Sequence, residues 1–136
     1  MTLHNAFSDW VARDWISLDW DTWHTPIDVE HELNKAFVFM NFKYGKDSFY
    51  ILRRRSPRGG THVLIKTRFM MKDTERFDLR SLFNDDMARL NWDMIRANGE
   101  SLTNYSRGVL FDAKMIPYQG ERLFTPGEWE LYHGDK

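Results

Sequence analysis

Strict alternation of apolar and polar residues marks two segments in the first half of the chain. In residues 15–21, Ile16, Leu18 and Trp20 alternate with polar residues, which is typical of a strand with one buried face. Residues 48–55 and 61–69 also suit strands, and the Ser-Pro-Arg-Gly-Gly sequence between them favours a turn. Residues 48–69 therefore predict a β-hairpin with Val63 and Ile65 on one face and His62 on the other.

Helical spacing of apolar residues marks two longer segments. Residues 26–44 carry one such stripe, bounded by a Thr25–Pro26 start signal and a Gly45 stop signal. A second helix is predicted from Asp78 to Asn98, with an apolar stripe formed by Leu79, Leu82, Phe83, Met87, Leu90 and Met94.

The second predicted helix also carries charged residues at spacings of three and four: Asp85, Asp86, Arg89, Asp93 and Arg96. Residues so spaced lie along one side of a helix and can pair there. We therefore expect these charges to form a solvated ion-pair stripe, and Trp20 and Trp92 to lie in the core or at its rim.

These elements, together with a last alternating run at 107–116, follow the order β-α-β-β-α-β. That order predicts an α+β, ferredoxin-like or RRM-like sandwich, in which a four-stranded antiparallel sheet carries two helices on one face. The first and third strands are then central, and the fourth strand pairs with the first. We expect one domain over residues 1–136, with a core at 15–116, an N-terminal extension at 1–14 and a tail at 117–136 packed on the core.

The sheet face opposite the predicted helices carries the candidate chemistry. Asp19 and Asp21 point to that face, roughly 6–7 Å apart at Cα, and two such carboxylates can share a Mg²⁺ or Mn²⁺ ion. By the same alternation, His62 lies beside them on the third strand, and Asp112 and Lys114 lie beside them on the fourth. The alternative interpretation is that all five are ordinary polar residues of a half-buried sheet.

Basic residues concentrate on the predicted hairpin. An anion-binding surface is the favoured interpretation, because arginine and lysine beside a glycine-rich turn suit phosphate contact. The alternative is a solubilising strand edge that blocks association between sheets. The candidate phosphate ligands are Arg53, Arg55, Arg58, Lys66 and Lys114.

Composition narrows the class of protein. The 136 residues include 20 acidic and 19 basic side chains and no cysteine. Disulfides, thiolate metal sites, cysteine nucleophiles and a uniformly basic surface are therefore excluded. No apolar run approaches the roughly 20 residues of a membrane span, and the N-terminus lacks the apolar core of a signal peptide. We expect a soluble cytoplasmic domain without a membrane partner; the sequence leaves the oligomeric state open.

Three short motifs resemble those of the catalytic palm of the archaeo-eukaryotic primase superfamily. Residues 16–21 read ISLDWD, residues 60–62 read GTH and residues 110–112 read LFD. The resemblance implies that Asp19, Asp21 and Asp112 bind divalent metal, that His62 contacts the phosphates of an incoming nucleotide, and that the protein acts in DNA replication. Residues 58–65 also resemble the RRM signature of RNA-binding proteins. Residues 79–114 look like proteins of archaeal viruses. If the protein is viral, we expect it in the cytoplasm of the host cell.

Several functions remain open from the residues. The first is a nucleic-acid-associated protein with a primase-palm-like metal and nucleotide site, in minimal or degenerate form, acting on DNA or RNA and nucleoside triphosphates. Alternatives are a non-catalytic nucleic-acid-binding module on the same face and a viral protein–protein interaction domain without an active site. A metal-dependent nuclease is the other enzymatic alternative, because residues 112–114 read DAK and Asp93 can serve as a partner carboxylate.

Overall fold

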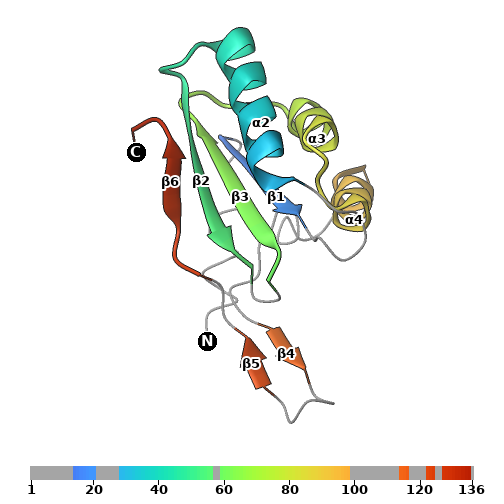
Figure 1. The fold of residues 1–136 in the computed structure, drawn as a ribbon. Helices are drawn as coiled ribbons and strands as arrows, with labels where there is room; N and C mark the ends of the chain where they lie inside the picture. The colour runs from blue at the N-terminus through green and yellow to red at the C-terminus, as the bar shows by residue number, and fades with distance from the viewer. Residues whose placement is uncertain are drawn as a thin grey trace.

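The computed structural model describes residues 14–20, 28–56, 59–98, 114–116, 122–124 and 127–135; for 96–98, 114–116 and 122–124 only the backbone is described. The strands are β1 (Trp15–Trp20), β2 (Phe49–Arg55), β3 (Thr61–Thr67), β4 (Lys114–Ile116), β5 (Arg122–Phe124) and β6 (Glu130–His133). The helices are α2 (Val29–Tyr44), α3 (Asp73–Leu82) and α4 (Met87–Asn98) (Figure 1). The predicted α+β class is confirmed.

The predicted first strand and hairpin are confirmed. Strands β2 and β3 pair antiparallel, and β1 pairs antiparallel with the other edge of β3. Ile16, Leu18, Val63 and Ile65 all lie in the main hydrophobic core, so the alternation assigned the two sheet faces correctly. This core lies between the sheet and α2.

The predicted strand order is wrong. Among the described residues, the four-stranded sheet has the order β1-β3-β2-β6. Its fourth strand, β6, pairs with β2, and β1 lies at the opposite edge. The ferredoxin-like order would have placed the run 107–116 beside β1. Lys114–Ile116 instead pairs with Arg122–Phe124 in a separate two-stranded sheet, and residues 107–113 lie outside the described residues.

Helix α2 begins at Val29 and not at residue 26. Asp28 is its N-cap: the side chain accepts a hydrogen bond from the backbone N–H of His31 at 3.1 Å. Gly45 ends the helix with a φ of 95°, a backbone conformation that glycine adopts without strain. Between these ends, Leu33, Ala36 and Met40 are buried against the sheet.

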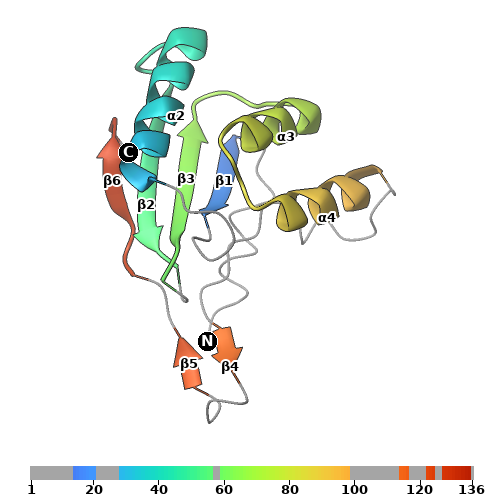
Figure 2. The same ribbon diagram turned by 45° about the vertical axis from the view of Figure 1, so that its right-hand side comes forward.

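The second predicted helix is two helices, so three helices accompany the sheet within the described residues. Helix α3 begins at Asp73, before the predicted Asp78, and the helical path breaks at residues 83–86. Asn84 adopts a φ of 57°, which a continuous α-helix does not permit. The Asp86 side chain then accepts a hydrogen bond from the N–H of Ala88 at 2.9 Å and starts α4. Figures 1 and 2 show α3 and α4 beside β1, at the sheet edge away from β6.

Candidate functional site

A row of three polar side chains crosses three neighbouring strands. The strand register places Asp19 of β1 and Arg54 of β2 on either side of His62 of β3. Arg54 Nε donates a hydrogen bond to His62 Nδ1 at 3.0 Å, and His62 Nε2 lies 3.8 Å from Asp19 Oδ1. Because Nδ1 accepts a hydrogen bond, the neutral imidazole carries its proton on Nε2, on the side of Asp19.

The three residues of this row differ in exposure. His62 is 3% exposed and Arg54 is 8% exposed, whereas the Asp19 side chain is 26% exposed. A buried guanidinium needs partners for its charge and its donors. The hydrogen bond to His62 and the ring of Trp129, whose centroid lies 4.4 Å from the guanidinium carbon, both contribute to that environment.

The face of the sheet that carries this row is not simply polar. Leu52 and Leu64 are buried there as a second, small apolar cluster. Aromatic and basic side chains alternate around that cluster: Lys66 lies over the ring of Trp15, with its ammonium 5.5 Å from the ring centroid. The aromatic residues packed against the cluster are Trp15, Tyr50 and Trp129.

The predicted metal ligands are only partly described. Asp19 and His62 lie together, as predicted from the alternation of their strands. Asp21 and Asp112 lie outside the described residues. Within the part of the chain that the structure describes, no group of three or more acidic or histidine residues is placed to hold a metal ion. The full set of Asp19, Asp21 and Asp112 therefore stays a prediction.

The predicted phosphate ligands do not gather at this row. Arg53 forms a salt bridge with Glu30 of α2, and its guanidinium lies over the ring of Tyr132. Strand alternation places Arg53 and Arg55 on the face opposite Arg54. Lys66 lies on the face of His62, but four residues further along β3, where it pairs with Asp14.

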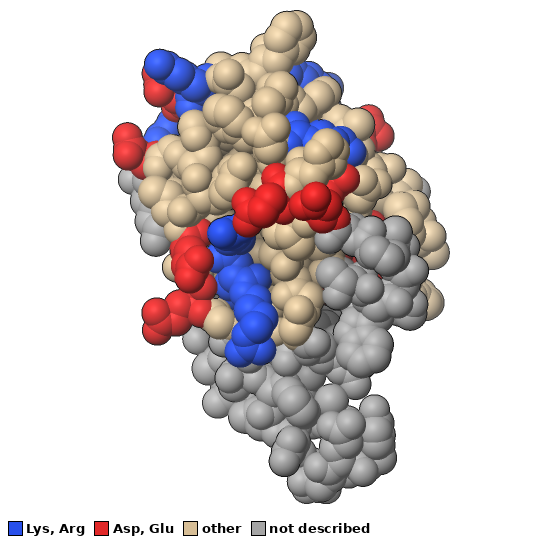
Figure 3. Space-filling view, in the orientation of Figure 1, with Lys and Arg blue, Asp and Glu red and all other residues tan. Residues whose placement is uncertain are grey.

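The two remaining predicted phosphate ligands give no support for a shared site. Arg58 lies outside the described residues, and Lys114 belongs to the separate β4–β5 sheet. In the view of Figure 3, basic and acidic side chains lie next to one another. The basic residue that the structure does bring to His62 is Arg54. Arg54 lies two residues after Leu52 on β2 and so on the same sheet face, and this alternation could have identified it from the sequence.

The free edge of β1 is sealed by side chains of α3, α4 and the turn between them. Residues 15, 17 and 19 direct their backbone groups away from β3. Arg76 Nε donates to the carbonyl of Trp15 at 3.0 Å, and Arg89 Nη1 donates to the carbonyl of Ser17 at 3.2 Å. The N–H of Asp19 donates to Asp85 Oδ1 at 2.8 Å. Side chains thus make the hydrogen bonds that another strand beside β1 would have made to these backbone groups.

Two of these edge-sealing side chains, Asp85 and Arg89, belong to a buried charge network. Arg80 contacts Asp85 at 2.7 Å and Asp93 at 2.9 Å, and Arg89 contacts Asp85 at 2.8 Å. The side chains of Arg80, Asp85 and Asp93 are at most 2% exposed. The expected solvated stripe is therefore wrong for Asp85, Arg89 and Asp93. Asp93 is engaged by Arg80, so its proposed role as a nuclease carboxylate loses support.

The charge network bears directly on the candidate site. Asp85 receives the backbone N–H of Asp19, and Arg89 Nη2 also donates to the hydroxyl of Ser17. One residue further, Trp20 Nε1 donates to the carbonyl of Phe83 at 2.9 Å. The strand that carries Asp19 is thus held by β3 on one side and by the α3–α4 unit on the other.

Comparison of the chain with protein-family models, with curated proteins and with solved structures found no match. Among the residues that the structure describes, none of the helices has the length and apolar character that crossing a membrane requires.

Proposed function

We propose that the row of Asp19, His62 and Arg54 is the metal- and phosphate-binding part of a primase-palm-like site on a nucleic-acid-associated protein, in minimal or degenerate form. One observation carries the proposal. The two motifs that the structure describes meet as cross-strand neighbours on one sheet face, with His62 Nε2 3.8 Å from Asp19 Oδ1. A palm-like site requires this juxtaposition.

Each residue has a chemical role in this proposal. Asp19 is an oxygen donor on a rigid strand and is partly exposed, which fits a ligand of Mg²⁺ or Mn²⁺; Asp21 and Asp112 would complete the set. His62 presents an N–H on the side of Asp19, and Arg54 adds a positive charge behind it, so both favour a phosphate at this position.

The reaction class that follows is nucleotidyl transfer. A 3′-hydroxyl attacks the α-phosphate of a nucleoside triphosphate, the hydroxyl proton leaves and pyrophosphate is released. Bound divalent ions would supply activation of the hydroxyl and neutralisation of the leaving group. Of the residues of this chain, His62 would orient the triphosphate, and Arg54 would hold the His62 ring in place from behind.

Mn²⁺ titration tests the metal part of the proposal. We expect the wild-type protein to bind Mn²⁺, measured by electron paramagnetic resonance of the free ion, and Asp19→Asn to weaken binding by about tenfold or more. The matched control is Asp78→Asn, which removes an exposed carboxylate on α3. Equal Mn²⁺ affinity of wild type and Asp19→Asn would reject the metal site.

Nucleotide binding tests the phosphate part separately. His62→Gln should weaken binding of a nucleoside triphosphate in the presence of Mn²⁺ while leaving Mn²⁺ binding alone nearly unchanged. Isothermal titration of both ligands on the same variant separates the two effects. Unaltered triphosphate affinity in His62→Gln would remove His62 from the proposed site.

A second candidate function is single-stranded nucleic-acid binding without catalysis. It is favoured by the aromatic and basic side chains that alternate on the same face, where bases can stack on rings and phosphates can meet cations. Lys66→Glu should then weaken binding of a labelled oligonucleotide, and wild-type affinity should fall steeply with salt. Arg55→Glu, on the opposite face, is the control. Asp19→Asn separates the two functions, because it should leave this binding intact or strengthen it.

A further inference from the structure

Asp85 lies in the turn between α3 and α4, and both oxygens of its carboxylate are engaged. Oδ1 accepts a hydrogen bond from the backbone N–H of Asp86 at 2.8 Å, and Oδ2 accepts one from Arg80 Nε at 2.7 Å. Arg89 Nη1 donates to the two oxygens at 3.0 and 2.8 Å. The Asp85 side chain is fully buried, so these bonds form away from water. Its carboxylate is therefore an acceptor held in one position.

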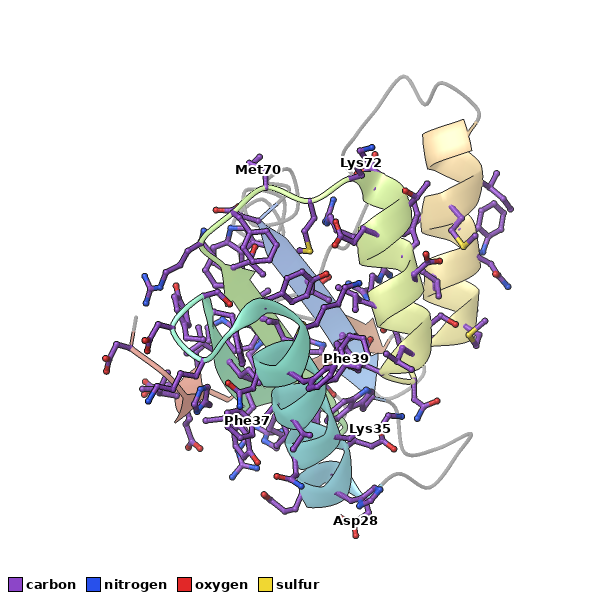
Figure 4. All side chains as sticks on the ribbon, turned by 90° about the horizontal axis from the view of Figure 1, so that it is seen from above. Asp28, Lys35, Phe37, Phe39, Met70 and Lys72 are labelled. Atoms are coloured by element: carbon purple, nitrogen blue, oxygen red, sulfur yellow. The ribbon has the colours of Figure 1, made fainter. Side chains whose placement is uncertain are left out.

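This acceptor meets β1 at the residue that carries the candidate chemistry. The N–H of Asp19 donates to Asp85 Oδ1 at 2.8 Å. Asp19 directs this N–H away from β3, so the pairing of β1 with β3 does not hold it. Figure 4, seen from above, shows α3 and α4 side by side next to β1, on the side of β1 away from β3. Asp19 is thus held by β3 from one side and by Asp85 from the other.

The position of the Asp19 N–H also affects the Asp19 side chain. The backbone nitrogen and Cβ are bonded to the same Cα, and the peptide unit is planar. An acceptor that sets the direction of the N–H therefore also sets the direction in which Cβ leaves the strand. A metal ligand must be held close to its productive position, and loss of a supporting contact typically weakens metal binding by about 10- to 100-fold.

We infer that Asp85 is a positioning residue for Asp19: its carboxylate fixes the β1 backbone so that the Asp19 side chain is directed to a divalent metal ion beside His62. This inference rests on the proposed metal site and adds to it a residue from outside the sheet. Asp85 acts through the backbone of Asp19 and is not itself a ligand, because N–H donors already engage both of its oxygens.

The effect of Asp85 on Asp19 is one of position and not of added negative charge. Arg80 and Arg89 balance the charges of Asp85 and Asp93 within the buried network. If Asp85 only stabilised the fold, its variants would weaken metal binding as far as they reduce the folded fraction. A positioning residue instead changes the metal affinity of the folded protein. Variants that change the acceptor position and the charge of Asp85 independently separate the two roles.

Asp85→Glu keeps the charge and moves the carboxylate by about 1.5 Å, the length of one C–C bond. We expect this variant to weaken Mn²⁺ binding by the full chain about tenfold or more, measured by electron paramagnetic resonance of the free ion. Asp93→Glu is the matched control, because Asp93 shares the buried Arg80 guanidinium with Asp85 and gains the same extra methylene. It should keep the Mn²⁺ affinity of the wild type.

Asp85→Asn makes the opposite change, because it removes the charge and keeps the size of the side chain. The Oδ1 position receives two backbone N–H groups, so the amide oxygen of asparagine should take that position and still accept from Asp19. We expect Asp85→Asn to unfold at a lower urea concentration than the wild type and yet to keep a Mn²⁺ affinity close to it. Circular dichroism shows which variants are folded before the titration.

The outcomes distinguish this inference from the proposed function. A folded Asp85→Glu with wild-type Mn²⁺ affinity would overturn the inference. A folded Asp85→Asn that binds Mn²⁺ tenfold more weakly than the wild type would also overturn it, and so would affinities of the three variants that simply follow their urea midpoints. In each of these cases the wild type still binds Mn²⁺, so the proposed metal site stands. Absence of Mn²⁺ binding by the wild type would reject the proposed function and this inference together.

Discussion

Helices α2 and α4 accompany the same sheet but bury opposite kinds of surface. Helix α2 lies over a sheet face and buries Leu33, Ala36 and Met40 against apolar side chains. Helix α4 lies beside the edge of β1 and turns Arg89 and Asp93 inward. Its apolar residues Met87 and Ile95 are left at the surface.

The two helices bury different kinds of residue because α2 packs on a sheet face and α4 lies beside a strand edge. A sheet face presents side chains, so a helix on that face gains from burying apolar area. A strand edge presents N–H and C=O groups that have lost water and need hydrogen-bond partners. A helix at an edge therefore gains from charged and polar side chains, provided that their charges balance. Arg80, Arg89, Asp85 and Asp93 meet that condition with two positive and two negative charges.

The largest effect is expected when the edge-sealing network is broken at its centre. Asp85→Ala would leave Arg80 and Arg89 without their shared carboxylate and the N–H of Asp19 without an acceptor. We expect the free energy of unfolding to fall by about 3–5 kcal/mol, measured by urea denaturation. Asp78→Ala on the exposed side of α3 is the control. A loss below about 1 kcal/mol would indicate that the network is solvated.

A comparable loss of stability is expected when a buried apolar side chain of α2 is removed. Leu33→Ala removes a side chain that is fully buried between α2 and the sheet, and should lower the free energy of unfolding by about 2–5 kcal/mol. Asn34→Ala changes the exposed neighbour and should leave stability nearly unchanged. If the two variants unfold at the same urea concentration, α2 does not cover the core as described.

A smaller, pH-dependent effect is expected at the end of α2. The Tyr44 hydroxyl donates to Glu75 of α3, and burial, then this hydrogen bond and the charge of Glu75, raise the pKa of Tyr44 above its ordinary value. A pKa that is higher in the folded state stabilises the fold below the unfolded pKa, and this stabilisation is lost as pH rises through the folded value.

Tyr44→Phe should therefore lower the free energy of unfolding by about 1 kcal/mol at pH 7 and weaken the loss of stability on going from pH 9 to higher pH. Urea denaturation of both proteins across that range measures the two slopes. Parallel slopes would show that Tyr44 does not contribute to the alkaline response.

The smallest effect on the monomer is expected at exposed apolar positions. Met87→Ser on α4 and Phe42→Ser on α2 should each change the unfolding free energy by less than about 0.5 kcal/mol in dilute solution. Urea denaturation of both variants measures the change. A loss above about 1 kcal/mol in either variant would show that its side chain is packed in the folded state and not exposed.

Local patterns predicted the parts of the fold that depend on neighbours in sequence. Alternation placed β1 and the hairpin, and assigned Asp19 and His62 to one face, because successive side chains of a strand point to opposite sides. Helical spacing placed α2, because residues three and four apart in sequence lie on the same side of a helix. Sequence reasoning did not assign Arg54 to the row. The alternation of side chains along β2 places Arg54 on this face just as the alternation along β3 places His62 there.

Two features escaped prediction because competing patterns were equally good. Residues 78–98 satisfy helical spacing throughout, and this spacing outweighed two local signals of the break. Asparagine, as at Asn84, adopts the left-handed conformation more readily than most residues, and Asp86 is a suitable N-cap for α4. The run 107–116 alternates as well as a sheet strand does and was expected beside β1. Its described part instead pairs with Arg122–Phe124, and the fourth strand of the main sheet is Glu130–His133, which lies beside β2. Alternation indicates that a segment forms a strand, but it does not determine which other strand that segment pairs with.

Alternation and helical spacing thus determined the hairpin, β1, α2 and the sheet face on which Asp19 and His62 each lie, since each depends on backbone geometry over a few residues. The pairing of Asp19 with His62 depended on the contact of β1 with β3. The strand order and the inward side of α4 depended on how distant segments met. An unpaired strand edge requires hydrogen-bond partners, and the chain supplies them from Arg76, Asp85 and Arg89. That requirement turned the charges of α4 inward and left its apolar residues facing outward.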